Sequence, residues 1–202
     1  HDTVGLLGDN TDGVGLVRDL VHNLHLTLRD RRILLLGAGG AARGVLGPLL
    51  ELGPRELLIA NRTLPRALAL ARAWGHVPAL RAVGLESLGQ SADGLPHESA
   101  GASPDESVAF DLIINATAAS LQGTVPALPP QTVGATSVCY DLAYGHKDTA
   151  FVLWARRLGA AQVHMGLGML VEQAAESFHL WRGVRPDTAP VLAALRAAGA
   201  PP

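Results

Sequence analysis

A short apolar segment that runs directly into a glycine-rich turn is the feature that most constrains the fold of this chain. Residues 32–36 form a continuous apolar run typical of a buried strand, and residues 41–52 carry apolar side chains at helical spacing. Between them lie Gly37 and Gly39, which have no side chains and let the backbone turn tightly. This order of strand, turn and helix predicts the first unit of a doubly wound α/β fold.

The same alternation of short apolar runs and helical patterns continues along the chain. Further strands are expected at residues 57–60, 110–115 and 137–142, and further helices at 63–74, 149–158 and 168–181. The predicted architecture is Rossmann-like, with a mostly parallel sheet and helices on both faces. Residues 90–107 are rich in Ser, Gly, Pro and acidic side chains, which predicts a mobile surface loop. Residues 4–13 are typical of a chain entering at the edge of a strand.

Composition excludes several functional classes. Apolar residues make up 48% and charged residues 17%, with a net charge of −2, so intrinsic disorder and a strongly basic nucleic-acid binder are both excluded. The single cysteine, Cys139, forms no internal disulfide and supplies no zinc site, so we expect no metal and a reducing, cytoplasmic location. Without a long apolar run or a signal-peptide pattern, we expect no membrane partner.

The glycine-rich turn predicts a dinucleotide site. Gly37, Ala38, Gly39, Gly40 and Ala41 open a helix directly after a strand. The backbone of such a turn can approach a pyrophosphate, whose charge is met by free N–H groups at the helix N-terminus. The alternative is that the strand-to-helix turn needs glycine for backbone reasons alone.

The end of the second predicted strand indicates which dinucleotide binds. NAD-binding proteins place Asp or Glu there to accept a hydrogen bond from the ribose, whereas this chain has no carboxylate at that place. Arg62 and Arg66 would attract a 2'-phosphate, and Asn61 and Thr63 offer hydrogen bonds, so the pattern predicts NADP. The alternative is a solvated helix face, although the helix dipole disfavours cations at an N-terminus that binds no anion.

Six segments together resemble the shikimate dehydrogenase family, and they cover nearly the whole chain. They are residues 8–13, 37–46, 61–63 with Arg66, 111–117, 140–144 and 166–174. The resemblance implies reversible, NADPH-dependent reduction of 3-dehydroshikimate to shikimate, a step of aromatic amino-acid biosynthesis. A general acid and base must move the hydroxyl proton in such a reaction.

The resemblance also implies roles for individual residues. Asp12 matches the catalytic carboxylate, which pairs with a lysine and contacts the substrate. Tyr144 and Gln173 match two further substrate contacts, and the turn from Gly37 to Ala41 and residues 61–66 match the pyrophosphate and 2'-phosphate sites. The positions that match the nicotinamide site are Leu142, Gly166 and Met169.

The resemblance further implies a division into domains. Residues 1–11 match the end of a substrate-binding domain, residues 12–166 the NADP-binding domain, and residues 167–202 helices that pack on the substrate-binding domain. In this family that domain precedes the 8–13 segment and carries the catalytic lysine, which these 202 residues do not include. Lys147, the single lysine among 16 basic residues, matches a loop position instead.

These observations lead to specific expectations about the chain. On its own it should bind NADP without turnover. The alternatives to an NADP-dependent shikimate dehydrogenase are a stand-alone dinucleotide-binding module without catalysis and an NAD-using quinate/shikimate dehydrogenase. Residues 115–120 differ from the loop sequence that is usual in the family. The resemblance therefore does not predict the geometry of this loop around the cofactor ribose. An apolar face of the C-terminal helix is expected to drive self-association; it comprises Leu170, Val171, Ala174, Phe178 and Trp181.

Overall fold

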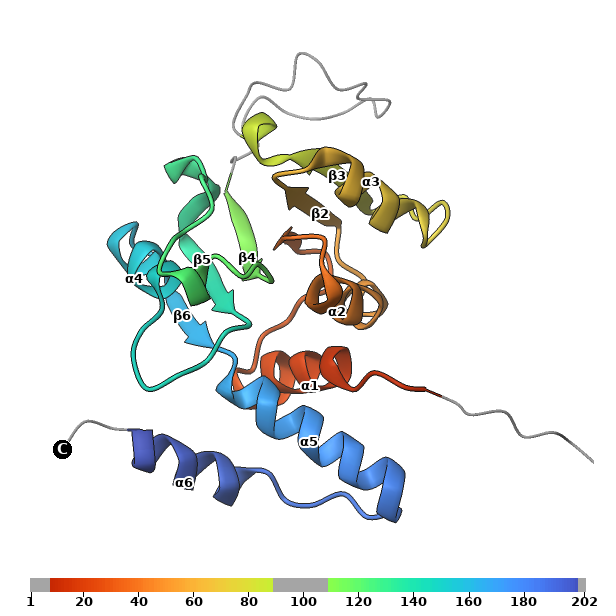
Figure 1. Ribbon diagram of the computed structural model, residues 1–202, viewed down its shortest axis with the longest axis vertical. Helices are drawn as coiled ribbons and strands as arrows, with labels where there is room; N and C mark the ends of the chain where they lie inside the picture. The colour runs from red at the N-terminus through yellow and green to blue at the C-terminus, as the bar shows by residue number, and fades with distance from the viewer. Residues whose placement is uncertain (1–7, 89–108, 200–202) are drawn as a thin grey trace, which may run out of the picture.

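The computed structural model describes residues 8–88 and 109–199, and the predicted surface loop at 90–107 lies outside these ranges. The sheet has six parallel strands in the order β3-β2-β1-β4-β5-β6 (Figure 1). This is the doubly wound, Rossmann-like arrangement, in which the strand order reverses between β1 and β4. The strands are β1 (Arg32–Leu36), β2 (Glu56–Asn61), β3 (Leu80–Gly84), β4 (Phe110–Asn115), β5 (Val133–Asp141) and β6 (Gln162–Met165).

Helices cover both faces of the sheet. The helices are α1 (Asp12–Arg18), α2 (Gly40–Glu51), α3 (Leu64–Arg72), α4 (Ala150–Arg157), α5 (Leu167–Arg182) and α6 (Ala189–Gly199). A π-helical turn, η1 (Asp19–Asn23), continues α1, and 3-10 turns occur at η2 (Leu85–Ser87), η3 (Ser120–Gln122) and η4 (Pro130–Thr132). None of the helices in the described ranges has the length and apolar character needed to cross a membrane.

Two apolar clusters hold these layers together because alternate residues of each strand face opposite sides. Ile33 and Leu35 of β1 face a cluster that includes side chains of α1, α2, α3 and α5. Leu34 and Leu36 face a second cluster with Phe151 of α4. All four β1 side chains are fully buried, as expected of a central parallel strand covered on both faces.

The chain begins differently from the sequence-based expectation. Residues 8–11 have no regular structure and Asp12 is the first residue of α1, so the expected strand edge is wrong for the described part of this segment. Gly13 and Gly15 of α1 have a packing role. A Cβ on Gly13 would lie 2.5 Å from the carbonyl oxygen of Gly44 in α2, and one on Gly15 would lie 2.5 Å from Cβ of Gln173 in α5. The glycines therefore let α1 lie directly against two other helices.

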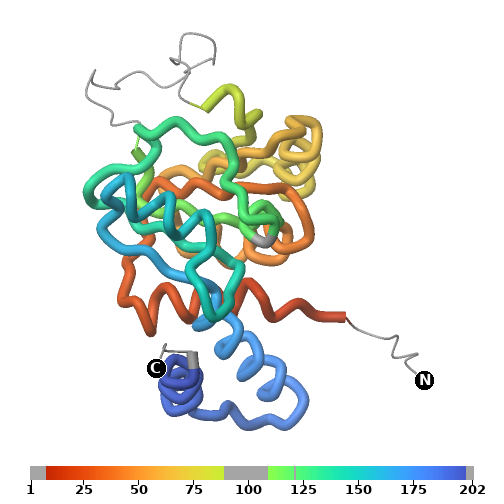
Figure 2. The backbone as a smooth tube through the Cα atoms, turned by 60° about the vertical axis from the view of Figure 1, so that its left-hand side comes forward, coloured from red at the N-terminus to blue at the C-terminus, as the bar shows by residue number. Residues whose placement is uncertain are grey.

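Helix α5 lies beside the first helix, and α6 follows it. Figures 1 and 2 show α5 running along α1, and α6 beyond α5 at the end of the molecule far from β3. Val171 and Met169 of α5 are buried, whereas Phe178 and Trp181 near its end are 47% and 80% exposed. The predicted apolar face is thus covered near the sheet and open toward the end of α5.

Candidate active site

A cavity of about 230 Å³ lies where α1, the end of β5 and the start of α5 meet. Its lining consists of Asp12, Leu142, Tyr144, Gly166, Met169, Leu170 and Gln173. The three residues that the resemblance assigns to the substrate and the three that it assigns to the nicotinamide all line this one space. Leu170 also lines this space, although the sequence pattern predicts it only as part of the apolar face of the C-terminal helix.

Asp12 is held at the cavity by the start of α1. Its backbone N–H donates to Oδ1 of Asn10 at 2.8 Å, which fixes the entry of the chain into the helix. A carboxylate in the first turn also interacts favourably with the positive end of the helix dipole. Pro48 of α2 has no N–H to donate to the Gly44 carbonyl, so Gly13 can pack against that oxygen. This contact seats the first turn of α1 on α2.

The floor of the cavity depends on close backbone packing at Gly166. A Cβ there would lie 2.3 Å from the carbonyl oxygen of Leu142, so glycine is required. The Gly166 N–H donates to the carbonyl of Ala143 at 3.0 Å. These contacts bring the segment after β5 against the first turn of α5, and Tyr144, which is 52% exposed, lies at the rim.

Met169 is positioned by a buried phenol. The Tyr140 hydroxyl accepts a hydrogen bond from the Met169 N–H at 3.3 Å and donates one to Oδ2 of Asp19 at 2.6 Å. The first N–H groups of a helix have no partner within the helix, so this phenol oxygen caps α5. Burial, together with the Asp19 carboxylate, raises the pKa of Tyr140 well above its usual value, so the phenol stays protonated at neutral pH.

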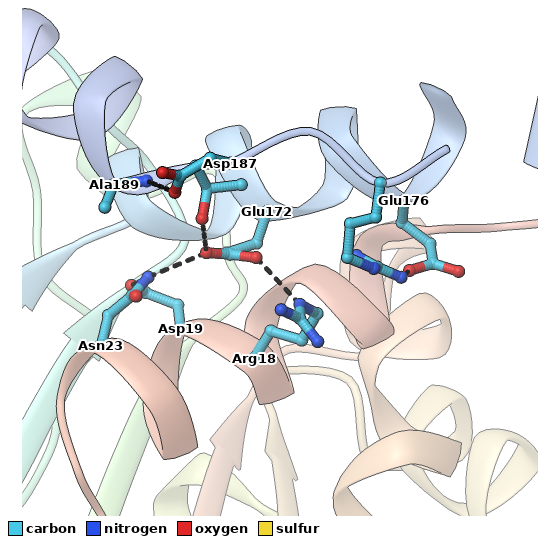
Figure 3. Close-up of polar contacts among 9 residues, drawn as sticks. Arg18, Asp19, Asn23, Glu172, Glu176, Asp187 and Ala189 are labelled. Carbon is cyan, nitrogen blue, oxygen red and sulfur yellow. Dashed lines mark hydrogen bonds and ion pairs between the residues drawn. The ribbon is translucent and has the colours of Figure 1, made fainter. Parts of the chain in front are cut away.

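A buried carboxylate joins α5 to the segments on either side of it (Figure 3). Glu172 receives hydrogen bonds from Asn23 of η1 at 3.2 Å and from Thr188, just before α6, at 2.7 Å, and it forms an ion pair with Arg18. Glu176 of α5 forms a second ion pair, with Arg185. Because Glu172 precedes Gln173, this network helps to fix the part of α5 that lines the cavity.

The predicted pyrophosphate turn lies between β1 and α2, beside the point where the strand order reverses. Gly37 has a φ of +106°, which favours glycine, and its N–H donates to the carbonyl of Ala60 at 2.8 Å. A Cβ on Gly39 or Gly40 would meet no atom within 4 Å, and Gly39 provides no side-chain cap for α2. The turn therefore has open space in front of uncapped N–H groups, which fits a phosphate group.

The predicted 2'-phosphate residues follow β2 at the same edge of the sheet. Asn61 donates from Nδ2 to the carbonyl of Thr63 at 2.9 Å, which orders the turn into α3. Arg62, Thr63 and Arg66 are exposed, and within the described ranges neither arginine forms an ion pair. Two unpaired cations at a helix N-terminus fit an anionic ligand.

The altered loop after β4 is well ordered by polar contacts. Asn115 is fully buried and donates to Oδ1 of Asp141 at 3.0 Å and to Oγ of Ser120 at 2.9 Å. Ser120 donates in turn to Oδ2 of Asp141 at 2.6 Å, and the Thr117 hydroxyl donates to Oδ1 of Asn115 at 2.7 Å. The loop lies against the phosphate turn, because a Cβ on Gly37 would be 3.0 Å from the carbonyl oxygen of Ala116.

Comparisons with known proteins identify the family of this chain. Residues 19–93 match the family model "Shikimate / quinate 5-dehydrogenase", and residues 166–196 match "Shikimate 5'-dehydrogenase C-terminal domain". The shikimate dehydrogenase (NADP(+)) of Aromatoleum aromaticum is 55% identical over 195 residues, which are 95% of this chain and 64% of that protein. The chain belongs to the shikimate dehydrogenase family.

Solved structures show a similar likeness. An Ael1 enzyme from Pseudomonas putida is 47% identical with a TM-score of 0.79, over 92% of this chain and 62% of that one. Shikimate 5-dehydrogenase from Thermus thermophilus, in complex with NADP(H) and shikimate, is 33% identical with a TM-score of 0.71. That match covers 95% of this chain and 63% of the Thermus thermophilus chain. The chain spans 64% to 65% of the length of two curated relatives that it matches.

Proposed function

We propose that this chain forms the NADP site and one wall of the substrate site of an NADP-dependent shikimate dehydrogenase, which interconverts 3-dehydroshikimate and shikimate in aromatic amino-acid biosynthesis. The observation that carries this proposal is the cavity shared by Asp12, Tyr144 and Gln173 with Leu142, Gly166 and Met169. Polar groups for a hydroxylated substrate thus lie beside apolar groups for a nicotinamide ring.

Each group has a distinct task in this reaction. NADP, when bound, supplies the acceptor or donor of hydride. Asp12 accepts a hydrogen bond from the reacting hydroxyl or from the lysine that moves its proton, and Gln173 and Tyr144 hold the other oxygen atoms of the substrate. Leu142 and Met169 give the nicotinamide ring an apolar surface that excludes water.

We propose that the proton-transfer lysine is not one of these 202 residues. Lys147 is exposed on the loop after Tyr144 and is not among the residues that line the cavity. A longer form of the chain, matching the length of the relatives, would supply the lysine. In this proposal residues 1–11 end a substrate-binding domain, residues 12–166 bind NADP and residues 167–202 pack on the substrate-binding domain.

Two further statements about partners and location belong to this proposal. When the 202 residues are present without the substrate-binding domain, the exposed apolar side chains of Phe178, Trp181 and Val184 would associate with a second copy of the chain. The cytoplasm is the proposed compartment, which is supported by the use of a single, buried cysteine, Cys139.

Titration calorimetry with NADP and NAD, run beside an assay of shikimate oxidation, tests the proposed function. NADP should bind the 202-residue chain more tightly than NAD, and a form with the length of the relatives should oxidise shikimate with NADP. Equal affinity for the two dinucleotides would favour the NAD-using alternative. Absence of turnover in the longer form would favour a binding module, and turnover by the 202 residues alone would contradict the need for a further lysine.

A further inference from the structure

We infer that Thr11 is a positioning residue that fixes the Gln173 carboxamide, so that its NH₂ group faces the substrate. The inference rests on the proposed function, because it concerns how Gln173 acts at the same cavity. The observation behind it is a chain of hydrogen bonds between the start of α1 and α5. Thr11 Oγ1 lies 3.1 Å from Oε1 of Gln173 and 3.0 Å from Oγ of Ser177.

Thr11 departs from the usual behaviour of a threonine at a helix start. It occupies the N-cap position of α1, where a hydroxyl normally accepts a hydrogen bond from a backbone N–H of its own helix. Here the side chain makes no capping hydrogen bond, and its backbone has helical φ and ψ of −91° and −3°. The hydroxyl contacts another helix, so the geometry assigns it a role between α1 and α5.

The direction of the hydrogen bonds follows from the number of protons. A threonine hydroxyl has one proton, and here it is donated to the carbonyl oxygen of Gln173. The Ser177 hydroxyl must then donate its own proton to Thr11. Ser177 and Gln173 are four residues apart and lie on the same side of α5, so one hydroxyl can bind both.

This arrangement leaves one polar atom of Gln173 for the cavity. With Oε1 bound to Thr11, Nε2 has no hydrogen-bond partner in the part of the chain that the structure describes. Asp12 on the same lining accepts hydrogen bonds, so an NH₂ donor beside it complements hydroxyl groups, which both donate and accept. With the amide reversed, Oε1 of Gln173 would face the cavity together with the Asp12 carboxylate, and both groups would be acceptors.

The chain offers a matched set of variants for the kinetic test. Thr11→Val removes the hydroxyl and keeps the shape, and Thr11→Ser keeps the hydroxyl. Thr124→Val removes an exposed hydroxyl that is not part of the cavity lining. In the form of the enzyme that oxidises shikimate, Thr11→Val should raise KM for shikimate about tenfold with little change in kcat. Thr11→Ser and Thr124→Val should stay near the wild-type values.

A double-mutant cycle separates positioning from a general structural effect. If Thr11 acts through Gln173, Thr11→Val should have no further effect on KM in a Gln173→Ala background. Additive losses, or equal losses in Thr11→Ser and Thr11→Val, would overturn the inference.

The side-chain amide signals of Gln173, followed by NMR in the 202-residue chain, give a readout that does not require turnover. Thr11→Val should shift these signals and average them over several orientations, whereas Thr124→Val should leave them unchanged. Unchanged Gln173 signals in Thr11→Val would overturn the hydrogen-bond chain even in an active enzyme. If these signals respond as expected but the longer wild-type form neither binds nor oxidises shikimate, the proposed function fails and the hydrogen-bond chain stands.

Discussion

Nε of Arg18 lies 2.9 Å from Oε2 of Glu172, so a partly buried ion pair connects the first helix of the described chain to α5. The Glu172 side chain is 2% exposed. Burial raises the pKa of Glu172, but hydrogen bonds from Thr188, Arg18 and Asn23 outweigh that effect, and the net pKa is lowered. The carboxylate therefore stays charged, and its charge stabilises the fold.

Glu172→Gln should lower the free energy of unfolding at pH 7 by about 1 to 2 kcal/mol, because it removes the counter-charge of Arg18, which is 31% exposed, and weakens charge-assisted hydrogen bonds to the carboxylate. A carboxyl whose folded pKa lies below the unfolded value of about 4.3 stabilises the protein above that pH and loses this effect as the pH falls through the folded pKa. The difference between wild type and variant, measured by urea unfolding, should therefore shrink below about pH 4. Glu51→Gln, at an exposed position of α2, is the control and should show no such loss. A difference independent of pH would contradict the assigned charge.

Arg62→Ala and Arg66→Ala should each weaken NADP binding about 10-fold to 100-fold and leave NAD binding nearly unchanged. The reason is that the two dinucleotides differ in the 2'-phosphate, which these side chains are proposed to contact. Calorimetric titration of each variant with both dinucleotides measures the effect. Arg72→Ala, an exposed arginine at the other end of α3, is the matched control. Equal losses for NADP and NAD would remove the argument for a 2'-phosphate site.

Asp12→Asn should reduce kcat for shikimate oxidation about 100-fold to 10,000-fold in the longer form of the enzyme. NADP affinity should be unchanged, because the phosphate turn belongs to other segments. The backbone hydrogen bond to Asn10 does not involve the carboxylate, so the fold should be retained. Asp9→Asn, an exposed neighbour, should keep wild-type activity. Substantial turnover by Asp12→Asn would show that this carboxylate is not part of the catalytic machinery.

Trp181→Ser should weaken self-association of the 202-residue chain. Trp181 is 80% exposed, Phe178 and Val184 nearby in the sequence are partly exposed, and removing the indole reduces the apolar area that a second copy could bury. Sedimentation velocity over a range of concentrations measures the shift toward monomer. A wild-type chain that remains monomeric at high concentration and binds no apolar dye would exclude this association.

The central strands could be predicted from the sequence because they are buried on both faces. Residues 32–36 and 110–115 were expected at the bounds that the structure shows. β3 and β6 were missed, and both lie at an edge of the sheet. An edge strand keeps partial contact with solvent, so Leu80–Gly84 and Gln162–Met165 lack a continuous apolar run.

The first helix was missed for a different reason. Gly13 and Gly15 lower helix propensity, and their packing against α2 and α5 outweighs that cost. The residues that line the cavity were available from the family resemblance. The residues that hold these side chains in place could not be predicted in this way. Thr11 and Ser177, for example, are 166 residues apart in the sequence, and no local pattern relates them.

The cavity and the phosphate turn use different stretches of the chain. The cavity is built from Asp12, from the segment after β5 and from the first turns of α5, whereas the predicted dinucleotide contacts at the phosphates follow β1 and β2. Under the proposed function, a substitution in α5 would thus alter which hydroxylated compound fits without changing the predicted phosphate contacts. The proposed substrate and the proposed choice of dinucleotide would therefore be open to change separately, by evolution or by protein engineering.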